Sequence, residues 1–331
     1  MERWDILMHG GPRDETRGEA LVMDSINEDL PLEDLPLNDL PLNDLPLNDG
    51  RKRTPASHSF AMANQRWFSG RVYALRRLTM FCWLLHNWRA VWTQYRLGGR
   101  LPSLRLRNGL IVQHGPGDDP VTLLDEVFWR RCYRREVTEP RHGVMIDIGA
   151  NIGLVTLDWA TRLPGATIHA YEPYPPTFSS LISNLKANGL LQKVSVHAEA
   201  VGRSGGTMVF PAVALSSLVS AYRQDANSHG SEEARVTTVS LDDVVARCTE
   251  GEAIRLLKID TEGAEGEILE GASSSTLSRI DQMVVEYHDN LVPQVRERCC
   301  AVLERAGFQY VARAITPDSG LLYAWQKTAR Q

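Results

Sequence analysis

Beyond residue 143 the apolar residues of the chain fall into short continuous runs that alternate with longer amphipathic segments. Short continuous runs predict strands buried on both faces, and apolar residues spaced three and four apart predict helices. The expected strands cover 143–148, 166–171, 194–199, 254–260 and 282–288. The expected helices cover 152–162, 176–188, 241–248, 264–271 and 293–306. Shorter strand-like pieces fill 206–239, and a hairpin spans 308–326.

This alternation predicts an α/β fold of the Rossmann-like, doubly wound kind, in which helices cover both faces of a mostly parallel sheet. The hairpin over 308–326 supplies an antiparallel addition to one edge of that sheet. The strand ends that carry polar residues are therefore expected to meet at one edge, where open α/β sheets bind their ligands.

The segment that precedes this region is rich in aromatic residues and arginine. Apolar residues recur at helical spacing within 66–100 and predict one amphipathic helix. Its apolar stripe consists of Phe81, Leu84, Leu85, Trp88, Val91, Trp92 and Tyr95. The stripe suits either docking on the catalytic domain or contact with an anionic membrane or a protein partner. After it, a hairpin is expected around Asn108 and Gly109, and a helix over 121–133.

Charge is distributed unevenly along the chain, although the formal total is only -5. Residues 1–50 hold thirteen acids and three bases, whereas residues 51–117 hold twelve bases and no acid. Within 31–49 a PLEDL or PLNDL unit repeats, and a proline every fifth residue prevents a continuous helix. We expect a disordered acidic tail over 1–53, a helical extension over 54–142 and a catalytic domain over 143–331.

The composition places the protein among ordinary globular proteins, with 43% hydrophobic and 23% charged residues. Its five cysteines show no C-x-x-C spacing, and the N-terminus lacks the pattern of a secretory signal. The longest uncharged apolar segment, 78–88, is too short to span a bilayer. A cytoplasmic protein with reduced thiols is expected. Nucleic acid is not an expected partner, because no binding motif accompanies the arginines.

The first motif with chemical meaning is IDIGANIG at 146–153, a strand that ends in Asp147 and a glycine-rich turn. Gly149 and Gly153 let the backbone approach a ligand, and the helix that follows offers unpaired N–H groups. The G-x-N-x-G spacing disfavours a dinucleotide pyrophosphate and suits a ligand with an amino-acid carboxylate. Glu172 follows twenty-three residues after Gly149, where an acid hydrogen-bonds the ribose of a bound nucleoside.

The second motif is KIDTEGAE at 258–265, which places Asp260 and Glu262 in another strand-to-helix turn. Two acids at such a turn indicate a ligand site, although capping of the next helix by Asp260 or Thr261 is an alternative.

Taken together, the motifs resemble the FkbM-type methyltransferases. The resemblance covers about 104–326 and rests on IDIGANIG, YEPYP, AVG at 200–202, SLDDV at 240–244, KIDTEGAEGEILEGA at 258–272 and VVEYH at 284–288. It implies a class I methyltransferase fold and S-adenosylmethionine as the methyl donor. It also implies O-methylation of a hydroxyl on a sugar, polyketide or similar small metabolite.

The resemblance also implies roles for individual residues. Asp147, Gly149, Asn151 and Gly153 would line the methionine part of the cofactor, Glu172 its ribose, and Glu199 would stand near its adenine. Asp260 and Glu262 would lie where the methyl group leaves.

An aliphatic hydroxyl needs a general base before it can accept a methyl group. Asp260 and Glu262 are the first candidates, His288 is next because its usual pKa suits neutral pH, and Glu286 is the fourth. No metal site is predicted; a divalent ion held by Asp260, Glu262 and Glu286 is the alternative. Two other functions compete with methyl transfer, namely a nicotinamide oxidoreductase and a catalytically silent scaffold that binds a partner through the N-terminal extension.

Overall fold

The computed structural model describes residues 72–115, 117–211, 233–249 and 252–326. These residues lie within the compact unit Ala61–Gln331. The predicted acidic tail over 1–53, including the PLNDL repeats, lies outside the described residues.

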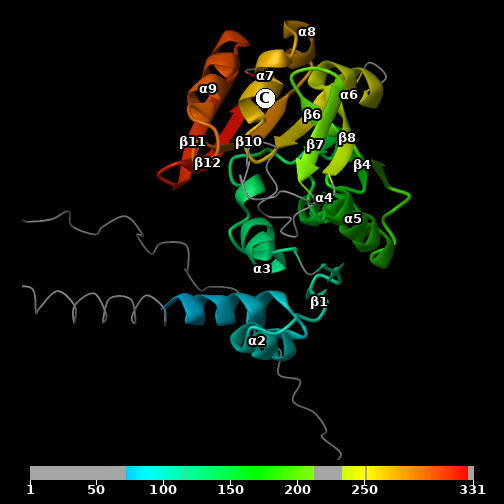
Figure 1. Cartoon of the computed structure of the whole chain (residues 1–331), viewed down its shortest axis with the longest axis vertical. Coiled ribbons are helices and arrows are strands. Elements are labelled where there is room, and N and C mark those ends of the chain that lie inside the picture. Colours follow the sequence, from blue (N-terminus) through cyan, green and yellow to red (C-terminus); the bar gives the residue numbers. More distant parts are fainter. Residues whose placement is uncertain (1–71, 116, 212–232, 250–251, 327–331) are drawn as a thin grey trace, which may run out of the picture. The chain divides into compact units, whose positions relative to one another are not determined.

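A seven-stranded sheet forms the centre of this unit, in the order β11-β12-β10-β9-β3-β4-β5 (Figure 1). Its strands are β3 (His142–Ile148), β4 (Gly165–Tyr171), β5 (Val194–His197), β9 (Ile254–Ile259), β10 (Gln282–His288), β11 (Gln309–Thr316) and β12 (Ser319–Trp325). The five strands from β5 to β10 run parallel, and β12 lies antiparallel between β10 and β11. The predicted doubly wound α/β fold with an antiparallel edge hairpin is confirmed.

The strand order reverses at β3, whose neighbours are β4 on one side and β9 on the other. After β3 the chain builds outward to β5, and it then returns to the other side of β3 to form β9. The carboxyl ends of β3 and β9 therefore flank the point at which doubly wound sheets open a ligand crevice.

Helices cover both faces of the sheet because its strands are apolar on both sides. On β3, Met145 belongs to one buried cluster with α4 (Leu154–Arg162) and α5 (Pro175–Ala187). Ile146 and Ile148 belong to the other cluster, with α6 (Leu241–Cys248), α7 (Glu265–Gly271) and α9 (Val295–Arg305). A short helix, α8 (Ser274–Leu277), precedes β10.

The helix predicted over 66–100 is divided in the described part of the chain. Residues 72–84 are helical, and α2 (Trp88–Leu97) follows after a break. The break arises because Leu85 forms a bridge with Leu106, which adjoins the hairpin of β1 (Leu104–Arg105) and β2 (Ile111–Val112). The hairpin itself forms as predicted, with Gly109 at a φ of 91° in its turn.

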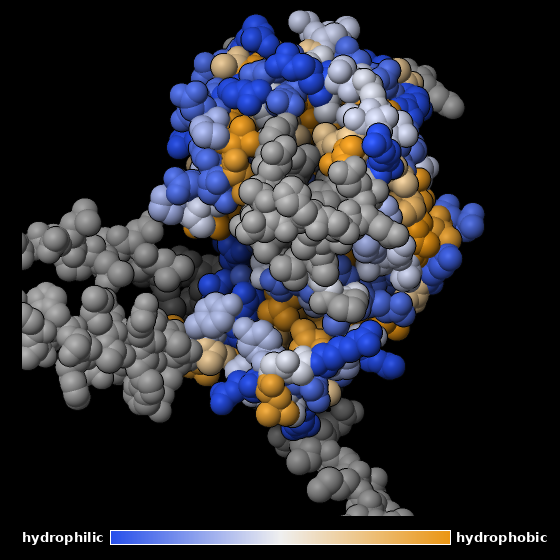
Figure 2. Space-filling model, viewed as in Figure 1, coloured by the Kyte–Doolittle hydropathy of each residue, from blue (hydrophilic) through white to orange (hydrophobic). Residues whose placement is uncertain are grey.

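The predicted apolar stripe of this segment packs onto the rest of the unit. Phe81, Leu85 and Val91 are fully buried, in the cluster that contains α4 and α5. Some apolar side chains on the other side of the segment are exposed, among them Trp83 and Leu97. On the surface around α2, these hydrophobic side chains are interspersed with hydrophilic ones (Figure 2). The stripe is therefore used for docking within the chain.

The segment predicted as one helix over 121–133 forms three different turns. α3 (Pro120–Leu124) passes into a π-helical turn, η1 (Asp125–Trp129), and a 3-10 turn, η2 (Cys132–Arg134), follows. Arg131 between them has a φ of 54°, a left-handed conformation that ends the helix. These turns bring η1 and η2 to the carboxyl edge of the central sheet.

A second, three-stranded sheet has the order β6-β8-β7. Its strands are β6 (Ala200–Gly202), β7 (Gly206–Pro211) and β8 (Glu233–Ser240). The sequence predicted strand pieces over 206–239 but not β6, and the strand expected over 194–199 ends at His197.

Two further features bear on the class of protein. None of the helices in the described ranges combines the length and apolar character that a bilayer span requires. The five cysteines all lie in those ranges, and all are free thiols.

Candidate functional site

A pocket opens at the carboxyl ends of β3, β4 and β9. Six of the predicted site residues line it: Gly149, Asn151, Glu172, Glu199, Asp260 and Glu262. The other four, Asp147, Gly153, Glu286 and His288, are not among its lining residues. The structure thus gathers most of the predicted residues around one space and places the remainder behind its walls.

The glycine turn after β3 forms the floor of the pocket. Gly149 has a φ of 74°, and a Cβ atom there would collide with the main-chain carbonyl oxygen of Asp260. The N–H groups of Gly149 and Ala150 donate to the carbonyl oxygen of Tyr171, at 3.0 and 2.9 Å. Only glycine lets the backbone pass so close to its neighbouring strands. Gly153 does not line the pocket. A Cβ atom at this position would collide with the side chain of Leu181 on α5, so glycine is needed here for packing of the turn.

A buried ion pair lies beneath this turn. Asp147 is fully buried, accepts a hydrogen bond from the Thr156 hydroxyl at 2.6 Å and lies 3.1 Å from the Lys258 ammonium. The Lys258 ammonium also donates to the carbonyl oxygen of Gly149 at 2.5 Å and lies 3.4 Å from Asp260. Burial lowers the pKa of Lys258, but Asp147 and Asp260 outweigh burial and raise it well above the usual range. Asp147 therefore supports the site through Lys258 and does not face a ligand.

Glu172 connects the ends of β3 and β4. Its carboxylate accepts hydrogen bonds from the N–H groups of Asn151 and Tyr174, each at 2.9 Å. Burial raises the pKa of Glu172 to about 7, although these two hydrogen bonds oppose the rise. Each carboxylate oxygen keeps a further acceptor position. Glu172 can thus hold the turn in place and also accept hydrogen bonds from a ligand in the pocket.

Tyr133 from η2 joins two carboxylates, those of Asp260 and Glu286. Its hydroxyl donates to Glu286 at 2.6 Å and also lies 3.1 Å from Asp260. Burial, with Asp260 adding to it, raises the pKa of Glu286 to about 7. Burial next to the two acids also raises the pKa of Tyr133 well above its usual value. Asp260 lines the pocket, whereas Tyr133 and Glu286 do not.

Glu126 of η1 is a further acid near the same two carboxyl groups, although it does not line the pocket. Burial raises its pKa to about 8, and the neighbouring charges of Glu286 and Asp260 add to the rise. Carboxyl groups this close together repel one another when ionised, and a nearby cation would relieve that repulsion.

His288 lies between two glutamates behind the pocket. Its Nδ1 is 3.1 Å from Glu265, and its Nε2 is 3.6 Å from Glu262. Burial lowers the pKa of His288, but Glu265, Asp260 and Glu262 more than compensate and raise it to about 10. The imidazole is thus protonated at neutral pH. The expectation that His288 has a pKa suited to a general base is wrong, because the surrounding carboxylates stabilise the charged form.

Glu262 and Glu265 have different environments within the same motif. Glu265 is fully buried and accepts hydrogen bonds from the N–H groups of Thr261 and Gly263, both at 3.0 Å. Glu262 has a φ of 54° and lines the pocket, and burial raises its pKa to about 8. Glu265 thus stabilises the turn through these hydrogen bonds, and the turn places Glu262 at the pocket.

The remaining predicted cofactor residue, Glu199, lines the pocket beside Tyr171. Its carboxylate is 3.1 Å from the guanidinium of Arg247 near the end of α6. Glu199 follows β5, the edge strand of the central sheet, whereas Asp260 follows β9 on the other side of β3.

Potential metal ligands occur in two groups among the described residues. Donor atoms of Asp260, Glu262 and His288 lie within 4.8 Å of one another at the pocket. This differs from the alternative considered from the sequence, since His288 takes the place of Glu286. The second group consists of His169, His197 and Cys248, none of which lines the pocket.

Comparison with known proteins assigns the family. A family model of the FkbM methyltransferase domain matches residues 147–310. The 31-O-demethyl-FK506 methyltransferase FkbM of Streptomyces tacrolimicus is 32% identical over 240 residues, which are 63% of this chain and 90% of that protein. The chain belongs to the FkbM methyltransferase family.

Two further similar proteins have lower sequence identity to this chain. Methyltransferase sdnD of Sordaria araneosa is 30% identical over 212 residues, or 55% of this chain and 80% of that one. The crystal structure of methyltransferase FkbM from Methylobacillus flagellatus has 16% identity and a TM-score of 0.41, and the match covers 78% of this chain and 60% of that chain.

In this FkbM-family chain, four residues around the site were not singled out from the sequence: Glu126, Tyr133, Lys258 and Glu265. Lys258 did leave a signal, because a lysine inside the apolar strand IRLLKI requires a buried partner. Tyr133 left none, since its partners Asp260 and Glu286 are 127 and 153 residues away in the sequence.

Proposed function

We propose that this FkbM-family protein transfers a methyl group from S-adenosylmethionine to a hydroxyl group of a small or medium-sized metabolite. The observation that carries the proposal is the set of residues that line one pocket: Gly149 of the glycine turn, Glu172 after β4, and Asp260, which lies 3.1 Å from the Tyr133 hydroxyl. A relative of the chain has O-demethyl-FK506 methyltransferase in its name, which supports oxygen as the acceptor atom.

The residues of the pocket fit this cofactor. Gly149 lines the pocket with its backbone alone, so the methionine part can approach that backbone. Glu172 has acceptor capacity for the two ribose hydroxyls, and Glu199 stands on the same wall for the adenine side. When bound, S-adenosylmethionine supplies a methyl group activated by its sulfonium charge. The carboxyl groups of Asp260 and Glu262, which line the pocket, favour that charge when they are ionised.

Asp260 is the best placed general base. It lines the pocket, and its side chain is 20% exposed, so an acceptor hydroxyl can reach it. A tyrosine hydroxyl has one proton and donates it to one carboxylate at a time. Protonation of Glu286, whose pKa is raised to about 7, would let the Tyr133 hydroxyl donate to Asp260 instead of Glu286. A carboxylate of Asp260 that receives this hydrogen bond can take the acceptor's proton.

The role of Lys258 follows from the same geometry. Its ammonium holds Asp260 on one side and Asp147 on the other, so the carboxylate of Asp260 has a fixed position beside the glycine turn. Fixed alignment of donor and acceptor is the main requirement of an in-line displacement, which needs no covalent intermediate on the protein. We place this activity in the cytoplasm, because a reducing compartment suits five free thiols.

The test is methyl transfer by the purified full-length chain. The protein is incubated with S-adenosylmethionine carrying a deuterated methyl group and a panel of hydroxylated metabolites, and the products are analysed by mass spectrometry. We expect the label on an oxygen atom of at least one acceptor. Asp260→Asn should lower the single-turnover rate by about 10²–10⁴ with cofactor affinity largely kept.

The matched control is Asp318→Asn, the same change at an exposed aspartate between β11 and β12, and it should leave the rate unchanged. Failure of the wild-type chain to bind S-adenosylmethionine in calorimetry would support the silent scaffold. Transfer of the label to nitrogen or carbon would show that oxygen is the wrong acceptor.

A further inference from the structure

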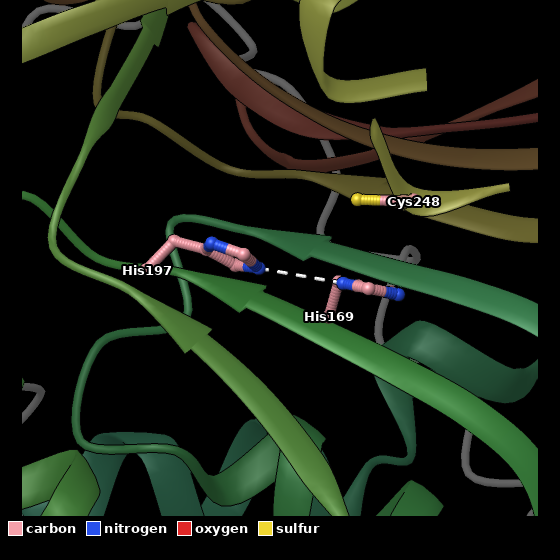
Figure 3. A group of neighbouring side chains, drawn as sticks. All are labelled: His169, His197 and Cys248. Carbon is pink, nitrogen blue, oxygen red and sulfur yellow. Dashed lines mark hydrogen bonds between the residues drawn. The ribbon is translucent and has the colours of Figure 1, made fainter. Parts of the chain in front are cut away.

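Two histidines and a cysteine meet on the face of the sheet that α6 covers (Figure 3). His169 lies on β4, His197 ends β5, and Cys248 is the last residue of α6. Donor atoms of the three side chains lie within 4.8 Å of one another. None of the three lines the pocket of the proposed methyl transfer.

The strand register explains why these residues converge. Tyr171 on β4 pairs with His197 on β5, and His169 is two residues before Tyr171. Side chains two residues apart lie on the same face of a strand, so His169, Tyr171 and His197 share one face. Tyr171 and Cys248 both belong to the buried cluster on the α6 side. The last turn of α6 therefore places a thiol over a pair of imidazoles.

We propose that His169, His197 and Cys248 bind one divalent transition-metal ion, with zinc as the preferred ion. His169 Nδ1 is 3.3 Å from His197 Nε2. Two nitrogen ligands of a tetrahedral zinc, each about 2.0–2.1 Å from the metal, lie roughly 3.3–3.4 Å apart. The donor set of two imidazoles and one thiolate is typical of zinc and unsuited to magnesium or calcium.

The surroundings of the three ligands are those of a metal site with oriented ligands. The hydroxyl of Tyr171 lies 3.2 Å from Cys248 Sγ and can donate a hydrogen bond to a thiolate. The ring of Tyr171 stacks on His197 with a centroid distance of 4.3 Å and an interplanar angle of 11°. Hydrogen bonds and packing of this kind fix the direction of metal ligands. Zinc binding would release the thiol proton of Cys248 to solvent.

The partial exposure of two of the three ligands leaves the site accessible to an ion. Cys248 is buried, whereas His169 and His197 are only partly buried. Three protein ligands leave a fourth position for water. The ion would join the end of α6 to the edge of the central sheet at β5, and Tyr171 would connect it to the pocket wall. We therefore assign it a structural role, independent of whether the methyl-transfer proposal is correct.

The experiment is a metal titration of the purified full-length chain after treatment with a chelator. Zinc is added, unbound zinc is removed, and bound zinc is measured by elemental analysis. We expect one zinc per chain, and cobalt(II) in its place should give the near-ultraviolet absorption of a thiolate bound to cobalt. Cys248→Ser should abolish that absorption. It should also weaken zinc binding by more than roughly 10–100-fold, which is the effect of losing a residue that only orients a metal ligand. Tyr171→Phe removes such a group and should weaken binding by about 10-fold.

Two control variants separate this site from the other thiols and from the acids of the pocket. Cys299→Ser changes a fully buried cysteine outside the group and should keep both zinc and the cobalt absorption. Asp260→Asn changes the other potential metal group and should keep them as well. If Cys248→Ser does not fold, His169→Asn replaces it in the zinc measurement, because His169 is only partly buried. The proposal is overturned if the wild-type chain retains no zinc, or if zinc is lost with Asp260→Asn and kept with Cys248→Ser.

Discussion

Replacement of Tyr133 by phenylalanine tests the connection between the two carboxylates of the site. The change removes one hydroxyl and keeps the ring in a buried position, where the residue is 4% exposed. The hydroxyl is the shared partner of Glu286 at 2.6 Å and Asp260 at 3.1 Å. Phenylalanine thus leaves both acids without this donor and adds no new group.

The expected magnitude follows from the charge of the acceptors. A hydrogen bond to an ionised group contributes about 1.5–3 kcal/mol, and each 1.36 kcal/mol corresponds to one pKa unit. Loss of the donor should therefore raise the pKa of the carboxyl group that acts as the base by about 1–2 units. Since the base must be ionised, the rate at low pH falls, and the acid limb of the pH–rate profile moves to higher pH by the same amount.

The assay is a pH series of single-turnover methyl transfer, with unfolding by urea measured on the same samples. Tyr323→Phe is the matched control, because Tyr323 is equally buried and its hydroxyl donates to the main-chain carbonyl oxygen of Cys132. We expect the control to lose roughly 0.5–1.5 kcal/mol of stability with an unchanged pH profile. An unchanged pH profile in Tyr133→Phe, with stability lowered as in the control, would refute the proton connection.

Three further outcomes are expected. S-adenosylmethionine affinity should fall as the pH drops below about 7, because Glu172 then becomes protonated, and Glu172→Gln should show weak, pH-independent binding in calorimetry. His288 stabilises the folded state as a cation, fully below its unfolded pKa of about 6.5 and less as the pH rises toward 10. The difference in unfolding free energy between wild type and His288→Gln should therefore shrink by a few kcal/mol from pH 6 to pH 10 in urea titrations. Lys258→Met should cost about 3–5 kcal/mol in the same assay, since Asp147 is left buried without a cation, whereas Lys186→Met at an exposed position of α5 should have little effect.

The sequence predicted the strands of the central sheet well because parallel strands are buried on both faces. The apolar run at 143–148, for example, corresponds to His142–Ile148. The sequence also predicted the pocket, since its walls are the turns after these strands, and Gly149, Glu172 and Asp260 are the residues that those turns present.

What the sequence did not predict depends on contacts between distant segments. The break in the helix over 66–100 follows from the bridge between Leu85 and Leu106, which no local pattern marks. The π-helical turn at Asp125–Trp129 replaces a regular helix, and the hydrogen bond from Tyr133 to Glu286 crosses 153 residues. The raised pKa of His288 also depends on contacts between distant segments, because His288 ends β10 whereas Glu262 and Glu265 belong to the turn after β9.

The position of β12 between β10 and β11 has a consequence for biosynthesis. β10 cannot gain its second neighbour until the chain has been translated through Trp325, because β11 contacts the sheet only through β12. During translation the nascent chain would therefore present β10, six of whose seven residues are buried in the finished protein, as an open strand edge. Such an edge invites pairing with other chains. A ribosome-stalled chain that ends before Ser319 should thus bind chaperones more strongly than one that extends well past Trp325.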